Sequence, residues 1–206
     1  MKSYRSIAFA LFTMFVLTVG LTGCQSNSGD TKQTNNKSKI DAVAFDFDDT
    51  LVFSTPAFEK GYSSDAEPFS KEFWKVVNAS DAGNSCVKTS VKKLLEKHRN
   101  KGREIYIITA REPHNTGPAK QFAQKKFGVP PAHFFFEPDG KTKRLKKLGV
   151  DIYYGDSDSD IKDARKANIK AVRIQRNKNS GYKDKYHPGK YNEKILKGTA
   201  SHDCSL

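Results

Sequence analysis

The chain predicts an α/β fold with a doubly wound parallel sheet and a small insertion after the first strand. Short apolar runs alternate with segments of helical spacing, and such alternation requires crossover connections between parallel strands. Acidic or hydroxyl side chains follow several of the apolar runs. Because open parallel sheets bind ligands beyond the carboxyl ends of their strands, these side chains indicate one shared site.

The expected elements follow one another between residues 40 and 206. The predicted strands are apolar and short, and lie at Asp41–Phe47, Glu104–Thr109, Phe134–Phe136, Asp151–Gly155 and Ala171–Ile174. The predicted helices have apolar residues at helical spacing or suitable end residues, and lie at about Val87–Gly102, Pro118–Phe127, Lys141–Leu148 and Ser159–Ala167. Residues 53–84 break this alternation, and we interpret them as an aromatic, loop-like insertion near the site.

Residues 1–23 are expected to form a secretory signal peptide. A basic start precedes an apolar run from Ile7 to Val19, which is too short and wrongly flanked for a convincing membrane-spanning helix. Leu21–Cys24 resembles a bacterial lipobox, so Cys24 is expected to carry a lipid. Ordinary cleavage, or an uncleaved anchor, is the alternative.

Residues 24–39 are polar and predict a flexible tether between the lipid and a domain at residues 40–206. The protein is therefore expected at the cell envelope. Gln25 is not a retention signal of the aspartate type, which favours the outer membrane in a bacterium with two membranes.

The other two cysteines and the basic charge leave two further questions. An oxidising export compartment would permit a disulfide between Cys86 and Cys204, but the sequence gives no distance between them, so their pairing stays open. The formal net charge is +13, yet the lysines are spread along the chain without an interleaved aromatic platform. This pattern favours a solvated basic surface over dedicated nucleic-acid binding.

Three carboxylates end the first apolar run. Asp46, Asp48 and Asp49 are followed directly by Thr50. Because buried carboxylates repel one another and resist desolvation, a cation is expected beside them. A divalent metal ion and a lysine would together balance the negative charge of these carboxylates. Such a combination is expected of a site that acts on a phosphate ester.

Further polar residues follow the later strands. Thr109 ends the second strand and Asp156 follows the fourth, while Lys143 lies near a helix start between them. A calcium-binding or structural acidic cluster is the alternative, because residues 156–160 resemble the start of a calcium loop. That segment lacks the later glycine and glutamate of such a loop.

These motifs together resemble those of the haloacid dehalogenase (HAD) superfamily of phosphatases, which has a Rossmann-type fold. The series is Asp-x-Asp-x-Thr at residues 46–50, a strand-end threonine, a lysine, and Gly-Asp-x-Asp-x-Asp at residues 155–160. Residues 45–58 and 154–161 look like the bacterial class B acid phosphatases. The resemblance covers about residues 40–182. It implies an exported, magnesium-dependent phosphomonoesterase, with phosphotransfer to other alcohols and a homo-oligomeric assembly.

The resemblance also implies a role for each carboxylate. Asp46 would be the nucleophile that forms an aspartyl-phosphate, and Asp48 would serve as general acid and then general base. Mg²⁺ would be held by Asp46, the Asp48 backbone carbonyl and Asp156, with Asp160 supporting that shell. Asp158 would either support the same shell or cap the helix.

The remaining site residues would bind phosphate or the leaving group. Thr109 and Arg111 would contact phosphate oxygens, and Lys143 would offset the negative charge, with Lys141 as its rival. Ala110 stands where the family often has glycine.

An apolar slot for aromatic leaving groups such as nucleosides is expected from Phe58, Trp74 and Tyr182, although Trp74 also suits the core of the insertion. The leading function is thus an acid phosphatase acting on small phosphomonoesters. A non-catalytic lipoprotein that binds nucleotides or a partner protein is the alternative.

Overall fold

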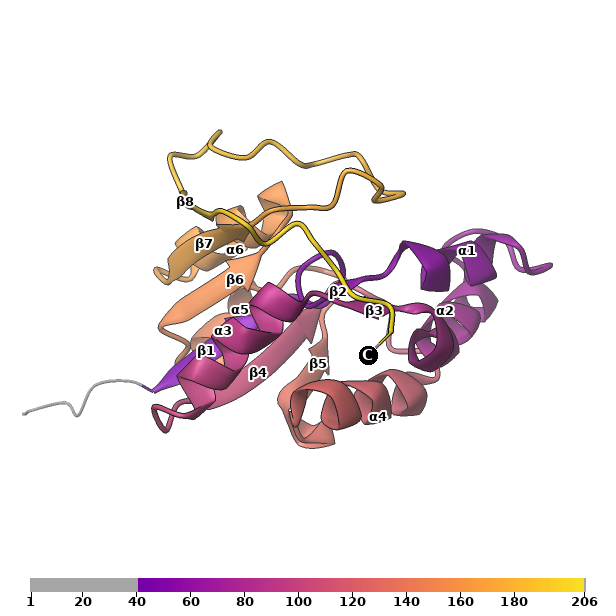
Figure 1. Cartoon of the computed structure of the whole chain (residues 1–206), viewed down its shortest axis with the longest axis horizontal. Helices are drawn as coiled ribbons and strands as arrows, with labels where there is room; N and C mark the ends of the chain where they lie inside the picture. The colour runs from indigo at the N-terminus through magenta and orange to yellow at the C-terminus, as the bar shows by residue number, and fades with distance from the viewer. Residues whose placement is uncertain (1–40, 206) are drawn as a thin grey trace, which may run out of the picture. The chain divides into compact units, whose positions relative to one another are not determined.

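The computed structural model describes residues 41–205, which form a sheet with helices on both faces (Figure 1). Six parallel strands run in the order β5-β4-β1-β6-β7-β8. Their bounds are β1 Ala42–Phe45, β4 Glu104–Thr109, β5 Phe134–Phe136, β6 Ile152–Gly155, β7 Lys170–Ile174 and β8 Lys194–Leu196.

The central strand β1 is buried on both faces. Val43 and Phe45 pack into one hydrophobic core, whereas Ala42 and Ala44 pack into a second. The first core includes side chains of α3 (Thr89–Arg99) and α4 (Thr116–Phe127), and the second includes those of α5 (Thr142–Lys147) and α6 (Asp158–Lys166). The predicted doubly wound α/β fold is therefore confirmed.

The order of the strands places a switch point beside β1. The chain passes from β1 outward to β4 and β5, and then returns to β6 on the other side of β1. Ligands of open α/β sheets bind at such a reversal, beyond the carboxyl ends of the strands. The residues that follow β1 and β6 therefore lie where a ligand site is expected.

The bounds of the predicted strands and helices agree with the structure to within about three residues. The strands Glu104–Thr109 and Phe134–Phe136 have the predicted bounds. The short edge strand β8 was missed, and a 3₁₀ helix, η1, occupies Pro131–His133.

The loop-like interpretation of residues 53–84 is wrong. This segment contains α1 (Thr55–Tyr62) and α2 (Lys71–Asn84), which pack together at one end of the sheet (Figure 1). The Ser70 side chain caps α2 by accepting a hydrogen bond from the Phe73 amide. Phe73, Trp74 and Val77 then share one buried face, so the aromatic residues of the segment mark a helical core.

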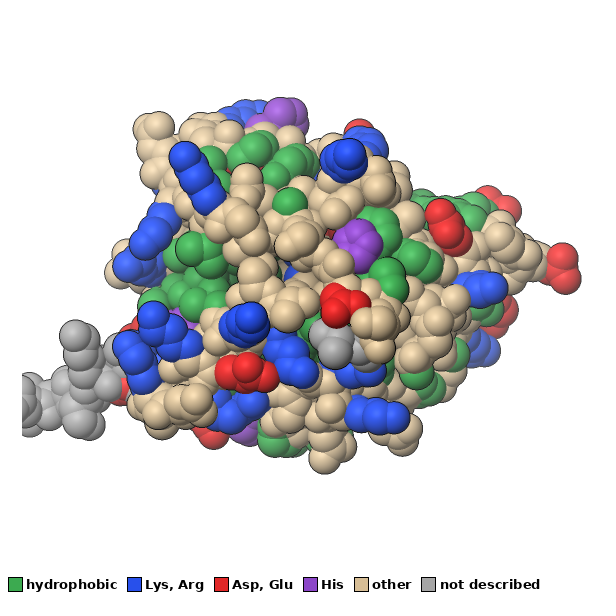
Figure 2. All heavy atoms as spheres, in the orientation of Figure 1, with side chains coloured by type: hydrophobic (Ala, Val, Ile, Leu, Met, Phe, Trp, Pro, Cys, Tyr) green, Lys and Arg blue, Asp and Glu red, His purple; other side chains and the backbone are tan. Residues whose placement is uncertain are grey.

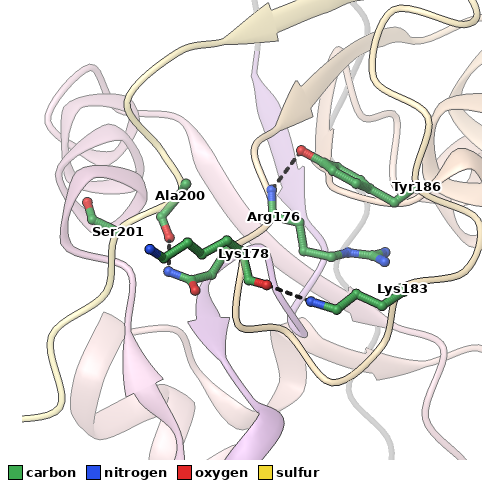
Figure 3. Close-up of a pocket in the computed structure, with 7 residues that line it drawn as sticks. Arg176, Lys178, Lys183, Tyr186, Ala200 and Ser201 are labelled. Carbon is green, nitrogen blue, oxygen red and sulfur yellow. Dashed lines mark hydrogen bonds between the residues drawn. The ribbon is translucent and has the colours of Figure 1, made fainter.

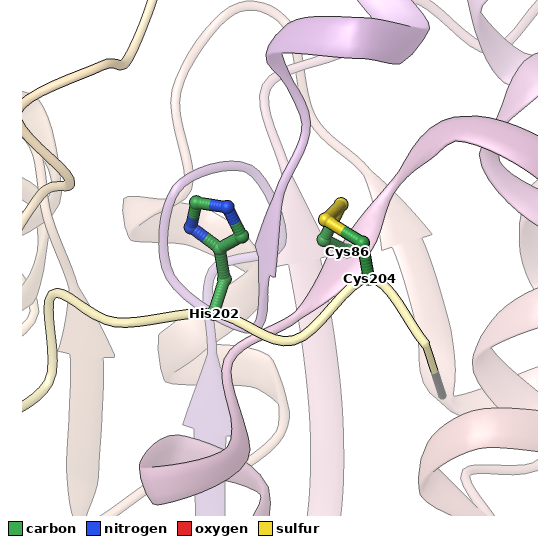
Figure 4. Close-up of side chains that lie close together, drawn as sticks. All are labelled: Cys86, His202 and Cys204. Carbon is green, nitrogen blue, oxygen red and sulfur yellow. A yellow bond between two sulfur atoms is a disulfide. The ribbon is translucent and has the colours of Figure 1, made fainter.

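A disulfide answers the open question about Cys86 and Cys204. The two sulfur atoms are bonded across a sequence separation of 118 residues (Figure 4). Cys86 lies in β3 (Cys86–Val87), which pairs with β2 (Val52–Phe53), and the Val87 backbone exchanges hydrogen bonds with Asp203. The C-terminal segment is thus fixed beside the two ends of the helical insertion. His202 lies beside the disulfide, whose sulfur atoms are both used in that bond.

The predicted signal peptide, Cys24 and tether lie outside the described residues. Within residues 41–205, no helix combines the length and the apolar character needed to cross a membrane. Lysine and arginine side chains are scattered over the face seen in Figure 2, with acidic side chains among them.

Candidate active site

The chain turns sharply after β1 and places two carboxylates beyond the carboxyl end of this central strand. The Asp46 amide donates to the Tyr154 carbonyl of β6 at 2.8 Å, which extends the strand pairing by one residue. The Phe47 carbonyl then accepts hydrogen bonds from the amides of residues 50–52. Asp46 and Asp48 consequently line the same cavity.

Lys141 is the cation beside Asp46. Its Nζ atom lies 2.5 Å from Asp46 Oδ1 and 2.7 Å from Asp160 Oδ1, and the lysine is only 4% exposed. Burial alone would lower the pKa of Lys141, but Asp160 and Asp46 outweigh it and raise the pKa above its usual value. Lys141 is therefore held as a buried cation between two carboxylates.

Asp156 follows β6 and faces the same cavity. Its Oδ1 atom accepts a hydrogen bond from the Thr50 hydroxyl at 3.0 Å, and its Oδ2 atom lies 2.6 Å from the nearest Arg176 nitrogen. Burial raises the pKa of Asp156, whereas Arg176 opposes that shift. Burial also raises the pKa of Asp46. Lys141 opposes this shift, whereas the neighbouring carboxylates add to it.

Asp46, Asp156 and Asp160 form a cluster that fits a hard divalent cation. One carboxylate oxygen from each lies within 4.8 Å of the others, and all three residues are buried. Oxygen donors of this kind suit Mg²⁺ or Ca²⁺. Burial raises the pKa of Asp46 and of Asp156, so a further cation beside these carboxylates would favour their ionised forms. The donor set therefore fits a metal ion.

Asp48 is oriented from the other side of the site. Its carboxylate accepts hydrogen bonds from the Thr109 hydroxyl at 3.2 Å and from Arg111 Nη2 at 2.6 Å. Arg111 is wholly buried and also contacts Asp81 of α2, with Nη1 2.7 Å from Oδ2. The helical insertion thus fixes the arginine that orients Asp48.

An aromatic wall completes the cavity, whose volume is about 560 Å³. Phe58 and Trp74 line it from α1 and α2, and Tyr182 lines it from the loop after β7. Trp74 lines the cavity and also packs in the core of the insertion. The aromatic lining continues toward Tyr62 and Phe69, which are about half exposed.

A family model of the HAD superfamily, subfamily IIIB (acid phosphatase), matches residues 24–185. The chain belongs to this family. It is similar to the class B acid phosphatases of Edwardsiella ictaluri (36% identical, covering 75% of this chain and 70% of the relative) and Marinomonas sp. (34% identical, covering 76% and 71%). Membership of the HAD acid phosphatases assigns phosphomonoester hydrolysis to this chain. HAD enzymes generally use a divalent metal, in agreement with the acidic cluster.

Solved structures share the fold at low sequence identity. A CbbY variant from Rhodobacter sphaeroides in complex with xylulose 1,5-bisphosphate has a TM-score of 0.55 at 14% identity, covering 77% of this chain and 94% of that one. A HAD family hydrolase from Deinococcus radiodurans has a TM-score of 0.51 at 15% identity, covering 78% and 91%. These likenesses support the HAD fold.

The structure corrects the expected position of the site lysine. Lys143 is exposed on α5, whereas Lys141 lies just before that helix and contacts Asp46. The two side chains leave the chain in different directions because α5 begins between them. The prediction that Lys143 lies among the carboxylates of this acid phosphatase is wrong, and its rival Lys141 takes that place.

Two other expected residues have partners that were not predicted. Asp160 belongs to the acidic cluster, but its Oδ2 atom also accepts hydrogen bonds from the Ser157 amide and hydroxyl, which caps α6. Asp158 instead contacts Arg173 and His187. Asp158 therefore does not join the cluster, and it lies at the first position of α6 rather than at its cap.

Sequence reasoning missed three residues of this acid phosphatase site. Arg176 contacts Asp156, Asp81 contacts Arg111, and Lys88 lies buried beneath the turn after β1. Arg176 follows the predicted strand Ala171–Ile174, and this position at a strand end is a local signal of a site residue. Lys88 and Asp81 carried no comparable signal, because each reaches the site from a segment distant in the sequence.

Proposed function

We propose that this acid phosphatase is magnesium-dependent and hydrolyses phosphomonoesters with aromatic or nucleoside leaving groups through an aspartyl-phosphate at Asp46. The observation that carries the proposal is the contact of Lys141 with Asp46 inside a buried cluster of carboxylates, next to an aromatic cavity. A nucleophilic carboxylate must approach an anionic phosphate, and cations on both sides reduce that repulsion.

In the first step, an Asp46 oxygen attacks phosphorus and the bond from phosphorus to the leaving oxygen breaks. Asp48 gives a proton to the departing alcohol. Lys141 opposes the rise in the pKa of Asp46 that burial causes, and it orients the carboxylate through its 2.5 Å contact with Oδ1, which leaves Oδ2 for the attack. The Thr109 hydroxyl, which donates to Asp48 in this structure, would donate to a phosphate oxygen when substrate is bound.

In the second step, Asp48 takes a proton from water and the water oxygen attacks phosphorus. The bond between phosphorus and Asp46 then breaks, which releases phosphate and restores the carboxylate. Arg111 orients the Asp48 carboxylate through its hydrogen bonds to Oδ1. Asp46, Asp156 and the Asp48 carbonyl would hold Mg²⁺, with Asp160 in support, and the bound ion supplies charge stabilisation for the phosphoryl group.

The aromatic wall supports a preference for aromatic leaving groups. Phe58 and Trp74 meet edge to face, with ring centroids 5.8 Å apart, and Tyr182 is 48% exposed at the cavity. An aromatic ring that packs against such side chains gains both apolar burial and stacking. An alcohol other than water could also accept the phosphoryl group in the second step, which would give phosphotransferase activity.

The test is hydrolysis of phenyl phosphate by the full chain, with Mg²⁺ and after chelation. The Asp46→Asn variant should lose activity and form no phosphorylated protein, whereas Asp65→Asn, an exposed matched control, should keep both. Activity that survives either chelation or Asp46→Asn contradicts the mechanism. No hydrolysis across a broad panel of phosphomonoesters would favour the binding lipoprotein instead.

The export, lipid anchor and assembly of the protein are also proposals. The lipobox-like sequence before Cys24 supports attachment to the cell envelope through an N-terminal lipid. Cells fed labelled palmitate should label the wild-type chain but not Cys24→Ser. Light scattering of the purified protein tests the homo-oligomer, and a monomer at all concentrations would contradict it.

A further inference from the structure

Lys88 is a buried cation that the proposed mechanism does not use. Its side chain is fully buried, and its Nζ atom donates to the Asp49 carbonyl at 2.5 Å and to the Gln175 carbonyl at 2.7 Å. Lysine is almost never fully buried without partners that satisfy its charge and donors. In this site those hydrogen-bond partners are backbone carbonyls.

The two carbonyls belong to two different loops of the active site. Asp49 lies in the turn after β1, directly after Asp48. Gln175 follows β7 and directly precedes Arg176, whose guanidinium contacts Asp156. One ammonium group therefore joins the loop that carries the expected nucleophile to the loop that holds an expected metal ligand.

Hydrogen bonds from Lys88 stabilise the turn after β1. Asp49 has a φ of +52°, a backbone conformation that is uncommon for residues other than glycine, although aspartate adopts it more readily than most. Such a conformation persists only where the surroundings over-determine it. Lys88 holds the Asp49 carbonyl, and the Ser180 hydroxyl holds its carboxylate. The Lys88 amide also donates to the Leu51 carbonyl at 2.9 Å, which fixes the far end of the same turn.

A second cavity lies beside the loop that follows β7. This cavity has a volume of about 610 Å³ and lies between residues 176–186 and the C-terminal segment (Figure 3). The Arg176 amide donates to the Tyr186 hydroxyl at 3.0 Å, and Lys88 holds the carbonyl of the preceding residue.

From these contacts we propose that Lys88 is a positioning residue of the phosphatase reaction. Its ammonium group joins the turn after β1 to the start of the loop after β7. Through that link it fixes the Asp48 carbonyl and the Asp156 carboxylate relative to each other. The inference deepens the proposed function and rests on it, because the two groups matter only if they hold a metal ion.

The test uses two variants of the full chain and one control. Lys88→Met keeps the length of the side chain but removes the charge and all donors. Lys88→Gln removes the charge and keeps two donors. The control, Tyr154→Phe, deletes a buried hydroxyl that contacts His98 at 2.8 Å on the core side of the sheet.

Four quantities are measured for each protein: kcat and KM for phenyl phosphate, the dissociation constant of Mg²⁺ by calorimetry, amide hydrogen exchange, and the unfolding midpoint. Lys88→Met should lower kcat at least tenfold and weaken Mg²⁺ binding at least tenfold, with KM changed less than threefold. Exchange in residues 46–52 and 175–186 should become at least tenfold faster. Lys88→Gln should lie between Lys88→Met and wild type, and Tyr154→Phe should match wild type in all but the midpoint.

Unchanged kcat, Mg²⁺ affinity and loop exchange in both Lys88 variants, with only a lower midpoint, would overturn the inference. If Lys88→Met does not fold, the same comparison is made with Lys88→Gln, and wild-type values there would overturn it equally. Absence of phosphatase activity in the wild-type chain refutes the proposed function instead. The exchange and Mg²⁺ measurements still decide whether Lys88 joins the two loops.

Discussion

Replacement of Lys141 by methionine should strongly lower both the stability and the activity of the protein. The same replacement of Lys143 should change neither. Methionine preserves much of the volume of lysine but removes the ammonium group that lies 2.5 Å from Asp46 and 2.7 Å from Asp160. Both carboxylates are buried, so the variant leaves them without their nearest cation. Breaking a buried ion pair from one side typically destabilises a protein by about 3–5 kcal/mol.

The effect on activity follows from the same contact. Loss of one preorganised group that stabilises developing charge lowers kcat by about 10²–10³-fold. Lys143 is exposed on α5, and surface substitutions of that kind usually change stability by less than about 0.5 kcal/mol. Lys143→Met is therefore a control with the same chemical change two residues away.

The pH dependence gives an additional check on Lys141. Burial raises the pKa of Asp46, and Lys141 is the group that most opposes this shift. A carboxyl group with a raised folded-state pKa loses stability as the pH increases through that pKa, because the unfolded chain releases its proton more readily. Without metal, Lys141→Met should therefore be more destabilised at pH 8 than at pH 5.

The assays are urea unfolding at the two pH values with chelator, and hydrolysis of phenyl phosphate with Mg²⁺. The reasoning is refuted if Lys143→Met loses activity while Lys141→Met retains it. It is also refuted if Lys141→Met has wild-type stability at both pH values, because the buried carboxylates would then not need the ammonium group.

Three further outcomes are expected. Cys204→Ser should destabilise the protein by about 5 kcal/mol in urea unfolding, because the disulfide closes a loop of 118 residues; a loss below about 1 kcal/mol would contradict this. Burial lowers the pKa of His98 to about 4, so stability should fall as the pH drops from 6.5 to 4, and less steeply in His98→Gln; equal slopes in the two proteins would argue against it. Tyr182→Ala should raise KM for phenyl phosphate about 2–10-fold and leave KM for glycerol phosphate unchanged; equal effects on both substrates would count against stacking.

The strands, and the site residues at their carboxyl ends, were predictable because the sequence patterns that indicate them are local. Glu104–Thr109 is an apolar run that ends in a hydroxyl, and it forms β4 with the same bounds. Asp46 and Asp156 were predicted to lie close together because the carboxyl ends of parallel strands lie on the same side of the sheet. The helices α1 and α2 were missed, since their aromatic residues were interpreted by composition and not by their spacing around Phe73 and Val77.

The sequence by itself determined the α/β class, the family and which carboxylates, for the most part, lie in the site. These properties depend on the order and spacing of residues within short segments. Only the tertiary structure decided which lysine meets Asp46, that Cys86 pairs with Cys204, and that Arg176 and Lys88 support the site. Each of these contacts joins segments far apart in the chain. Their geometry depends on where a helix begins and on how loops pack, which no local pattern specifies.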